Sequence, residues 1–381
     1  MKKVLHIFTL FETPKSFFDG QFRYLADNGY DIHLITSYDD RAVSFAQRNA
    51  IKYSPVVISR TISPVKDVKA IFKVCRYILK EHIDIVFGHT PKGAMVAMIA
   101  SFICGVRHRI YYRHGLVYVT KTGFAKCILK QEERLVSLLS TKIINVSPSL
   151  AEFSVQEKLN GRKKQICLGK GTCGGIDVRY KFNPENINNQ KLEAYRKQFG
   201  IKENDFIFGF CGRICKDKGI IELIEAFRMF KSEQSGSKLL LIGHYDSRDI
   251  LPNDKKNEIE NEEDIIVTGY VDQDIEYYYS LIDVFIFPSH REGFGMSVIE
   301  ASAMRKPVLV SRSCGCIDSI VEGETGLYID LEPKSIYDGM KYFLEKEKIV
   351  KYGDTGRKFV LKNFDHTVVW PFVLDLYRKM E

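Results

Sequence analysis

Two glutamates flank a glycine-containing segment in the C-terminal half of the chain. Glu292 precedes the segment and Glu300 follows it, and the residues directly after Glu292 are Gly293, Phe294, Gly295 and Met296. Residues 283–287 predict a buried strand before the segment, and residues 297–304 predict a helix after it. Because the first N–H groups of a helix lack intrahelical partners, this loop suits an anion or another polar ligand.

The two carboxylates beside this helix start have two interpretations. They could accept hydrogen bonds from sugar hydroxyls, one carboxylate at each end of an elongated ligand. They could equally be solvated charges that the positive end of the helix dipole stabilises. Residue type alone does not decide between a saccharide site and a solvated helix start.

A basic loop, residues 212–219, directly follows a predicted strand at residues 206–211. Arg213 can donate two hydrogen bonds to phosphate oxygens, and Lys218 can act as a point charge. Two cations on a loop bounded by glycines therefore suit a diphosphate. The alternative is a basic loop whose side chains are only solvated.

His114 directly follows a predicted buried strand, residues 109–113, in the N-terminal half. Its imidazole could contact a sugar hydroxyl, or it could be a structural residue whose hydrogen bonds are satisfied within the protein. The preceding Arg113 could add a phosphate contact or could face solvent. The strand end is therefore a second candidate site.

Strands and helices alternate along the first half of the chain. Apolar periodicity predicts strands at residues 4–9, 30–36, 56–58, 83–87, 109–113 and 142–146, and helices at residues 21–28, 65–80, 93–104 and 123–139. This alternation is typical of α/β proteins with a parallel, doubly wound sheet. Residues 169–174 fit G-x-G-x-x-G by letter, but no helix is predicted after them. They therefore predict a loop and not a dinucleotide-binding turn.

A second α/β series follows a polar link at residues 183–190. It predicts strands at residues 206–211, 238–243, 265–268, 284–287 and 307–311, and helices at residues 219–231, 273–280, 297–304, 334–347, 351–364 and 368–379. A chain of 381 residues is too long for one ordinary core. We therefore expect two domains, residues 1–182 and 183–365, with a C-terminal helix at about residues 366–381 packed back on the first.

Charge divides the chain unevenly. Residues 1–180 hold 28 Lys and Arg against 14 Asp and Glu, whereas residues 181–381 hold 28 against 34. A basic half indicates a surface that faces phosphate or an anionic membrane. It contains no nucleic-acid-binding motif, so nucleic acid is not an expected partner.

Cysteine usage and hydropathy predict a cytoplasmic protein. The nine cysteines are scattered without a C-x2-C pair, which indicates reduced thiols and disfavours a zinc site. The N-terminus leads directly into a strand and not into a signal peptide. The longest uncharged stretch, residues 93–106, is too short for a membrane span and predicts a buried helix.

The spacing of Glu292 and Glu300 resembles the E-x7-E signature of retaining glycosyltransferases with the GT-B fold. The flanking sequences PSHREGFG, IEASAMRKPVLVS and GCIDSIVEGETGLYI resemble glycosyltransferase family 4 and, within it, the CapM-like group of capsular-polysaccharide enzymes. Residues 212–219 resemble the family's G-R-x3-x-K-G segment, and His114 matches the His of its His-Gly pair at a strand end. Arg113 departs from the family, which usually has a small or aliphatic residue there.

The resemblance implies two Rossmann-like domains facing a cleft, with the acceptor on the N-terminal domain and the nucleotide-sugar donor on the C-terminal domain. It implies that Arg213 and Lys218 bind the diphosphate and stabilise the charge on the leaving nucleotide. Glu300 would hold the ribose hydroxyls, and Glu292 and His114 would contact the transferred sugar. Residues 293–296 would complete the donor site.

The implied reaction is retaining transfer of a hexosyl or N-acetylhexosaminyl group in surface polysaccharide biosynthesis. The expected donor is a UDP-sugar, and the expected acceptor is a polysaccharide or an undecaprenyl-diphosphate-linked glycan. No metal or other cofactor is expected, because Arg213 and Lys218 already supply positive charge. The D-x-D letters at residues 272–274 instead predict a helix N-cap at Asp272 or Gln273.

Three alternative functions stay open at this point. They are a sugar-nucleotide epimerase of similar fold, an NAD-dependent oxidoreductase, and a non-enzymatic sugar-nucleotide-binding subunit. The absence of a glycine-rich dinucleotide fingerprint counts against the oxidoreductase.

Two amphipathic stretches, residues 63–82 and 121–142, contain basic residues interspersed among apolar ones. We expect their apolar faces to pack on the sheet, as helices of a doubly wound fold do. The basic outer surface could then meet anionic headgroups and bring the protein to a lipid-linked acceptor as a peripheral protein on the inner face of the cell membrane.

Overall fold

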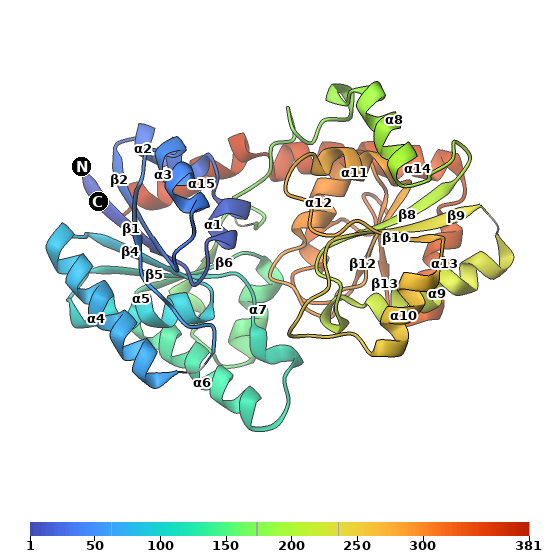
Figure 1. The fold of residues 1–381 in the computed structure, drawn as a ribbon. Coiled ribbons are helices and arrows are strands. Elements are labelled where there is room, and N and C mark those ends of the chain that lie inside the picture. The colour runs from blue at the N-terminus through green and yellow to red at the C-terminus, as the bar shows by residue number, and fades with distance from the viewer. Residues whose placement is uncertain (62, 173, 235, 381) are drawn as a thin grey trace. The chain divides into compact units, whose positions relative to one another are not determined.

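A computed structural model describes residues 1–61, 63–172, 174–234 and 236–380. The chain forms two compact units: Met1–Gly175 together with the segment from Thr367 onward, and Ile176–His366. Each unit contains one parallel sheet surrounded by helices (Figure 1), which confirms the predicted doubly wound α/β fold class. Residues 176–182, which the sequence analysis assigned to the first domain, lie in the second unit.

The sheet of the first unit has seven strands in the order β3-β2-β1-β4-β5-β6-β7. Their bounds are β1 (Lys2–Ile7), β2 (Tyr30–Thr36), β3 (Lys52–Pro55), β4 (Ile85–His89), β5 (His108–Arg113), β6 (Lys142–Asn145) and β7 (Gln165–Cys167). The strand order reverses between β1 and β4, which makes this position the topological switch point. The predicted strand at residues 56–58 is wrong, because Val56 and Ile58 belong to the buried core just after β3.

Among the described residues, eight α-helices belong mainly to this unit. They are α1 (Glu12–Phe17), α2 (Gln21–Asp27), α3 (Arg41–Arg48), α4 (Pro64–Glu81), α5 (Pro91–Ile103), α6 (Gly123–Leu139), α7 (Pro148–Gln156) and α15 (His366–Arg378). The C-terminal helix α15, red in Figure 1, lies among the blue N-terminal helices. It is held there partly by Trp370, whose Nε1–H donates to the Gly174 carbonyl at 2.8 Å.

The apolar faces of α4 and α6 do not pack entirely on the sheet, contrary to expectation. On α4, Val74 and Ile78 are buried, but Val68 and Phe72 are 65% and 69% exposed. On α6, Phe124 and Leu138 are 79% and 74% exposed. An 18-residue helix on a flat sheet buries only one stripe, so the apolar residues outside that stripe stay on the surface.

The sheet of the second unit has six strands in the order β10-β9-β8-β11-β12-β13, with its switch point between β8 and β11. Their bounds are β8 (Phe206–Cys211), β9 (Ser237–Ile242), β10 (Ile265–Val267), β11 (Val284–Phe287), β12 (Val308–Ser311) and β13 (Leu327–Ile329). The predicted limits of β8 agree with the structure residue for residue, and those of β11 agree to within one residue.

The described part of the second unit contains seven α-helices. They are α8 (Asn189–Gln198), α9 (Ile220–Glu233), α10 (Asn253–Asn261), α11 (Ile275–Leu281), α12 (Met296–Ala303), α13 (Pro333–Tyr342) and α14 (Lys346–Asn363). Helix α8 was not predicted, because none of its residues is buried and it has no apolar stripe. The predicted N-cap of α11 at Asp272 or Gln273 is wrong, since Asp274 occupies that position. Its carboxylate pairs with Lys191 at 2.7 Å.

Short 3-10 helices and one irregular loop complete the two units. The 3-10 helices are η1 (Val117–Thr120), η2 (Arg162–Lys164), η3 (Pro184–Asn186), η4 (Lys216–Lys218) and η5 (Ile317–Ser319). The loop that fits G-x-G-x-x-G opens no helix at residues 169–172 and 174, and Cys173 lies outside the described residues. Its Gly169 and Gly171 have positive φ angles of 55° and 115°.

Candidate active site

The strongest site candidate lies at the switch point of the second sheet. The loop after β8 carries Arg213 and Lys218, and the loop after β11 carries Glu292. In open parallel sheets, ligands bind outside the carboxyl ends of the strands at this point. The structure joins the two loops by an ion pair between Lys218 Nζ and Glu292 Oε1, whose side chains are only 12% and 16% exposed. The sequence had singled out both residues without predicting their contact.

Glycine geometry explains how these loops come so close. Gly219 has a φ of 69°, and a Cβ there would lie 2.0 Å from the carbonyl oxygen of Pro288, the residue directly after β11. Any other residue would therefore push the two loops apart. Lys218, the residue before this glycine, also lies over the Phe287 ring, with Nζ 5.6 Å from the ring centroid.

Arg213 is held by a second carboxylate. Its guanidinium pairs with Asp246, which is 6% exposed and lies after β9. Burial alone would lower the pKa of Arg213, but the bond to Asp246 and the charge of Glu292 raise it overall. Burial alone would raise the pKa of Asp246, but the N–H of Arg248 and the Arg213 guanidinium lower it to about 2.

Asp246 is a candidate site residue that the sequence analysis missed, since it pairs with Arg213. The available signal was its position in the loop after β9, the strand that neighbours β8 in the sheet. Together with Arg213, Lys218 and Glu292 it forms a cluster of two cations and two carboxylates. In such a cluster the carboxylates keep the two cations charged and ordered, and phosphate oxygens could replace the carboxylate oxygens as their partners.

Glu300 has different surroundings from Glu292. It lies on α12 and accepts a hydrogen bond from the Tyr279 hydroxyl of α11 at 2.7 Å. Burial raises its pKa, and the Tyr279 bond and the charge of Lys181 oppose that rise. Burial and the charge of Glu300 raise the pKa of the Cys211 thiol to about 12. Tyr279 was missed, although it lies on the helix just before β11.

The segment 293–296 connects the two glutamates through the start of α12. The Phe294 side chain is 5% exposed and packs against Phe364, with ring centroids 5.2 Å apart. Phe294 could therefore contact a ligand only through its backbone. Gly295 is the N-cap residue of α12, and Met296 is the first helical residue. The role of these residues in donor binding stays a prediction.

His114, in the first unit, is part of a longer hydrogen-bonded chain. Its Nε2 lies 3.0 Å from Nδ1 of His89, which in turn contacts His6. Burial lowers the pKa of His114 to about 3, so the ring is neutral at physiological pH. The sequence analysis missed His6 and His89. Their signal was their position near the carboxyl ends of β1 and β4, the two strands at the switch point.

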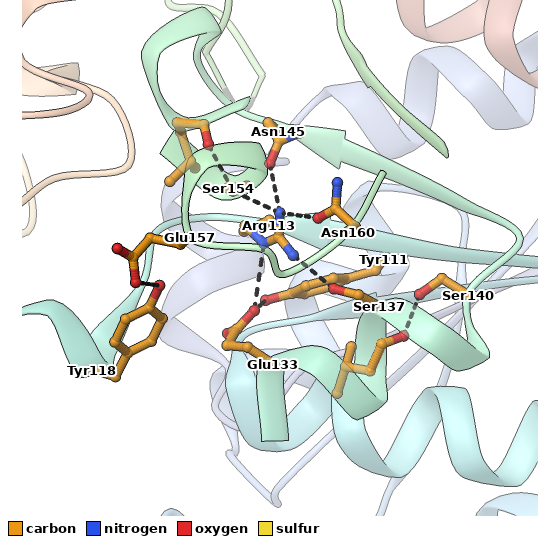
Figure 2. A network of polar contacts seen from close by, with 12 residues as sticks. Tyr111, Arg113, Tyr118, Glu133, Ser137, Ser140, Asn145, Ser154, Glu157 and Asn160 are labelled. Atoms are coloured by element: carbon orange, nitrogen blue, oxygen red, sulfur yellow. Dashed lines mark hydrogen bonds and ion pairs between the residues drawn. The ribbon is translucent and has the colours of Figure 1, made fainter. Parts of the chain in front are cut away.

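Arg113 has a structural role that the sequence analysis did not foresee (Figure 2). Its side chain is fully buried, so it neither faces solvent nor reaches a surface phosphate. The guanidinium donates to the side-chain oxygens of Asn145, Ser154, Asn160 and Ser137. Its Nε lies 3.4 Å from a carboxylate oxygen of Glu133. This network ties β5 to α6, β6 and α7.

Two family models match most of the chain. Residues 6–147 match the model described as "Glycosyl transferase 4-like", and residues 192–359 match "Glycosyl transferases group 1". The capsular polysaccharide biosynthesis glycosyltransferase CapM of Staphylococcus aureus is 30% identical over 99% of this chain and 97% of its own length.

Two further matches are a relative found by sequence and a solved structure of similar fold. An Escherichia coli relative named UDP-Gal:alpha-D-GlcNAc-diphosphoundecaprenol alpha-1,3-galactosyltransferase is 24% identical over 77% of this chain and 75% of its own length. The crystal structure of Anabaena HepE with UDP-glucose superposes with a TM-score of 0.81 at 17% identity, covering 99% of this chain and 100% of that one. This likeness confirms the GT-B fold. The chain is therefore a glycosyltransferase of family 4, in the group that contains the capsular polysaccharide enzyme CapM.

Proposed function

We propose that this glycosyltransferase moves a hexosyl or N-acetylhexosaminyl group from a UDP-sugar to a glycan acceptor, with retention of anomeric configuration. The observation that carries the proposal is the charged cluster of Arg213, Lys218, Asp246 and Glu292 at the switch point of the second sheet. We assign donor binding to the second unit and acceptor binding to the first.

The two cations fit the leaving group of this reaction. When the bond between the sugar and UDP breaks, negative charge develops on the diphosphate, and fixed cations at that place lower the barrier. Arg213 and Lys218 already sit beside carboxylates that keep them oriented, so diphosphate oxygens can replace these partners without a large rearrangement. We infer that these two residues, and not a metal ion, neutralise the leaving group.

The ion pair between Lys218 and Glu292 links the leaving group to the transferred sugar. A Lys218 that binds the diphosphate leaves Glu292 beside the sugar attached to that diphosphate. Glu292 would then accept a hydrogen bond from the sugar while one C–O bond to the diphosphate breaks, one to the acceptor hydroxyl oxygen forms on the same face, and the proton of that hydroxyl passes to the leaving diphosphate. For the first unit we propose, independently, that His114 contacts a saccharide hydroxyl. Retention is expected from the spacing of Glu292 and Glu300, which fits the E-x7-E signature.

Glu300 is suited to a neutral part of the donor. Its carboxylate has the Tyr279 phenol as a hydrogen-bond partner, and it can accept further hydrogen bonds from the two ribose hydroxyls. The backbone of residues 293–296 between the two glutamates would complete the donor site.

The relatives support a UDP-sugar and a lipid-linked acceptor. The E. coli protein is named for a UDP-galactose donor and a diphosphoundecaprenol-linked acceptor, and the HepE structure contains UDP-glucose. We propose the same classes of donor and acceptor here, in the biosynthesis of a surface polysaccharide.

A lipid-linked acceptor requires access to a membrane surface. Among the described residues, no helix combines the length and apolar composition needed to cross a bilayer. Helices α4 and α6 instead carry exposed apolar side chains, including Phe72 and Phe124, and α4 intersperses them with exposed lysines such as Lys69. Exposed aromatic and basic side chains on one helix suit an anionic bilayer surface. We propose that these helices make peripheral contact with such a membrane.

Release of UDP tests the proposed reaction directly. Purified protein is incubated with a panel of UDP-sugars, with and without an undecaprenyl-diphosphate-linked glycan, and UDP is measured. We expect UDP release that depends on both the donor and the acceptor, and a product of the same anomeric configuration as the donor. Activity only with other nucleotides would contradict the donor assignment, and an inverted product would contradict retention.

A further inference from the structure

A buried tyrosine hydroxyl contacts Glu300, the proposed ribose contact of the second unit. The Tyr279 hydroxyl of α11 donates to Oε2 of Glu300 on α12 at 2.7 Å, and the Tyr279 side chain is fully buried. Its ring packs against Phe182 and Phe285, with ring centroids 6.2 Å and 5.8 Å away. The core of the unit therefore holds this hydroxyl in place beside the carboxylate.

The bond runs in one direction when the carboxylate is ionised. Burial raises the pKa of Tyr279 well above its usual value, and the neighbouring Cys211 and Glu300 raise it further, so the phenol keeps its proton. An ionised carboxylate accepts hydrogen bonds and donates none. Tyr279 is therefore the donor, and Glu300 is the acceptor.

This bond leaves Glu300 able to bind a ligand. An ionised carboxylate has about four sites that can accept a hydrogen bond, and Tyr279 occupies one of them. Ordering a mobile glutamate side chain when a ligand binds costs conformational entropy. Because the Tyr279 bond already orders the side chain in the free protein, less of that cost remains when the donor binds.

The same bond favours the ionised form of Glu300. Burial raises the pKa of the Glu300 carboxyl, whereas the bond from Tyr279 and the positive charge of Lys181 oppose that rise. Cys211, at the end of β8, has a thiol pKa of about 12 and stays neutral. Among the described residues, Tyr279 of α11, Lys181 and Cys211 are the titratable or charged groups that act on Glu300. Loss of the Tyr279 hydroxyl would therefore favour a protonated Glu300, which is a poorer acceptor.

We propose that Tyr279 is a positioning residue for the donor nucleotide: its hydroxyl keeps the Glu300 carboxylate ionised and oriented as an acceptor for the ribose hydroxyls. Tyr279 acts through Glu300 and does not touch the donor, because its side chain is fully buried. The ligand in this proposal rests on the proposed function, in which Glu300 binds the ribose. The coupling of Tyr279 to Glu300 rests on their contact alone.

Tyr279→Phe tests the role of the hydroxyl, because it removes the donor and keeps the ring. Calorimetry with UDP should show an affinity about fivefold lower than that of the unaltered protein at pH 7, as for the loss of one hydrogen bond. The loss should be smaller at pH 9, because Glu300 in the variant stays protonated to a higher pH and ionises only there. The phosphates of UDP titrate alike with both proteins, so the difference between the proteins reports on Glu300. No loss, or the same loss at both pH values, would overturn the proposal.

A double-mutant cycle shows whether Tyr279 acts through Glu300. Glu300→Ala alone should weaken UDP binding, and adding Tyr279→Phe should cost less than about twofold more, because the shared contact is already lost. Additive losses would overturn the proposal. If Glu300→Ala leaves UDP affinity unchanged, the ribose contact in the proposed function is wrong and this inference falls with it. If Glu300→Ala weakens binding and Tyr279→Phe does not, only this inference is wrong.

Tyr337→Phe is a matched control in the same unit. The Tyr337 hydroxyl of α13 donates to Glu233 of α9, so this variant also removes a phenol from a carboxylate. Tyr337 is buried, and Glu233 is not a candidate site residue. We expect the control to bind UDP as the unaltered protein does, and thermal melting shows that each variant is folded at the assay temperature. An equal loss of UDP affinity in Tyr279→Phe and Tyr337→Phe would contradict a specific role for Tyr279.

Discussion

Arg113 is the last residue of β5 in the first unit, and Arg213 lies two residues after β8 in the second, but their surroundings differ. Arg113 is completely buried and binds the side chains of its own unit, including Glu133. Arg213 has a 35% exposed side chain and pairs with Asp246, whose side chain is 4% exposed. The same residue type near a strand end therefore serves the fold in one unit and, in our proposal, a ligand site in the other.

The wider sites differ in the same way. Around His114 the first unit has neutral imidazoles that hydrogen-bond to one another among aromatic rings. Around Arg213 the second unit has charges balanced by opposite charges. A bound ligand loses its hydrogen bonds to water, and the protein must replace them. Neutral donors and acceptors can do so for an uncharged saccharide, and cations can do so for a diphosphate.

Arg113→Leu should give the largest effect, on stability. It leaves Glu133 buried without its cation, which typically costs about 3–5 kcal/mol. Urea unfolding measures this loss, and Glu133→Gln in the same background should recover part of it. An Arg113→Leu variant that is fully stable but no longer binds the donor would contradict a purely structural role for Arg113.

Arg213→Ala should affect turnover more than stability. Loss of a charged hydrogen-bonded contact is worth about 2–3 kcal/mol, which is roughly a 30- to 160-fold fall in kcat/KM. Arg248→Ala is the control, since Arg248 Nε lies 3.8 Å from the same Asp246 carboxylate on a 58% exposed side chain. We expect the control to lose no more than about fivefold. Full activity of Arg213→Ala would place the diphosphate elsewhere.

The two glutamates should separate donor binding from transfer. Glu300→Ala should weaken UDP binding by about 1.5 kcal/mol, roughly tenfold, because the ribose loses a charged acceptor. Glu292→Ala should leave UDP binding nearly intact, since it releases Lys218 for the diphosphate, and should lower the rate of transfer. Calorimetry with UDP and steady-state kinetics measure both effects. An equal loss of UDP affinity in both variants would contradict the division of roles.

The raised pKa of Glu300 predicts a pH-dependent stability. Burial raises this pKa in the folded state, so the folded protein holds the proton to higher pH than the unfolded chain. Stability is therefore lost as pH rises through the folded-state pKa, and Glu300→Gln should remove that loss. We expect the variant to melt at a higher temperature than the unaltered protein at pH 8 and at the same temperature below the usual glutamate pKa. A variant that is less stable than the unaltered protein at pH 8 would show that burial does not destabilise the ionised Glu300 carboxylate.

The sequence could predict which candidate residues follow the strand ends but not how they pair. The strands β8 and β11 are buried apolar runs, so their ends, and hence Arg213 and Glu292, were predictable. The partner Asp246 was not, because the contact depends on which loops the sheet order brings together. Helix α8 was missed for the opposite reason, since it buries no side chain and leaves no periodic pattern.

Substitutions of exposed residues on the outer helices of the two units should have the smallest effects, and these effects should be on membrane binding. Exposed Lys69 and Phe72 lie on α4, whereas exposed Lys334 lies on α13 of the second unit. If only the first unit contacts an anionic bilayer, removing a lysine from the first unit should weaken vesicle binding, and removing one from the second unit should not. A lysine near such a surface contributes about 1 kcal/mol, so Lys69→Gln should weaken binding to anionic vesicles roughly fivefold.

Co-sedimentation with phosphatidylglycerol-containing vesicles measures this difference. Lys334→Gln, which removes the same charge from the other unit, should bind as the unaltered protein does. Binding should fade as salt rises, because exposed charges are screened over about 10 Å at 0.1 M salt. Phe72→Ser should also weaken binding, and its loss should persist at high salt because burial of apolar surface is not screened. Binding that ignores lipid charge, or equal losses for Lys69→Gln and Lys334→Gln, would contradict a membrane surface confined to the first unit and would favour a soluble acceptor.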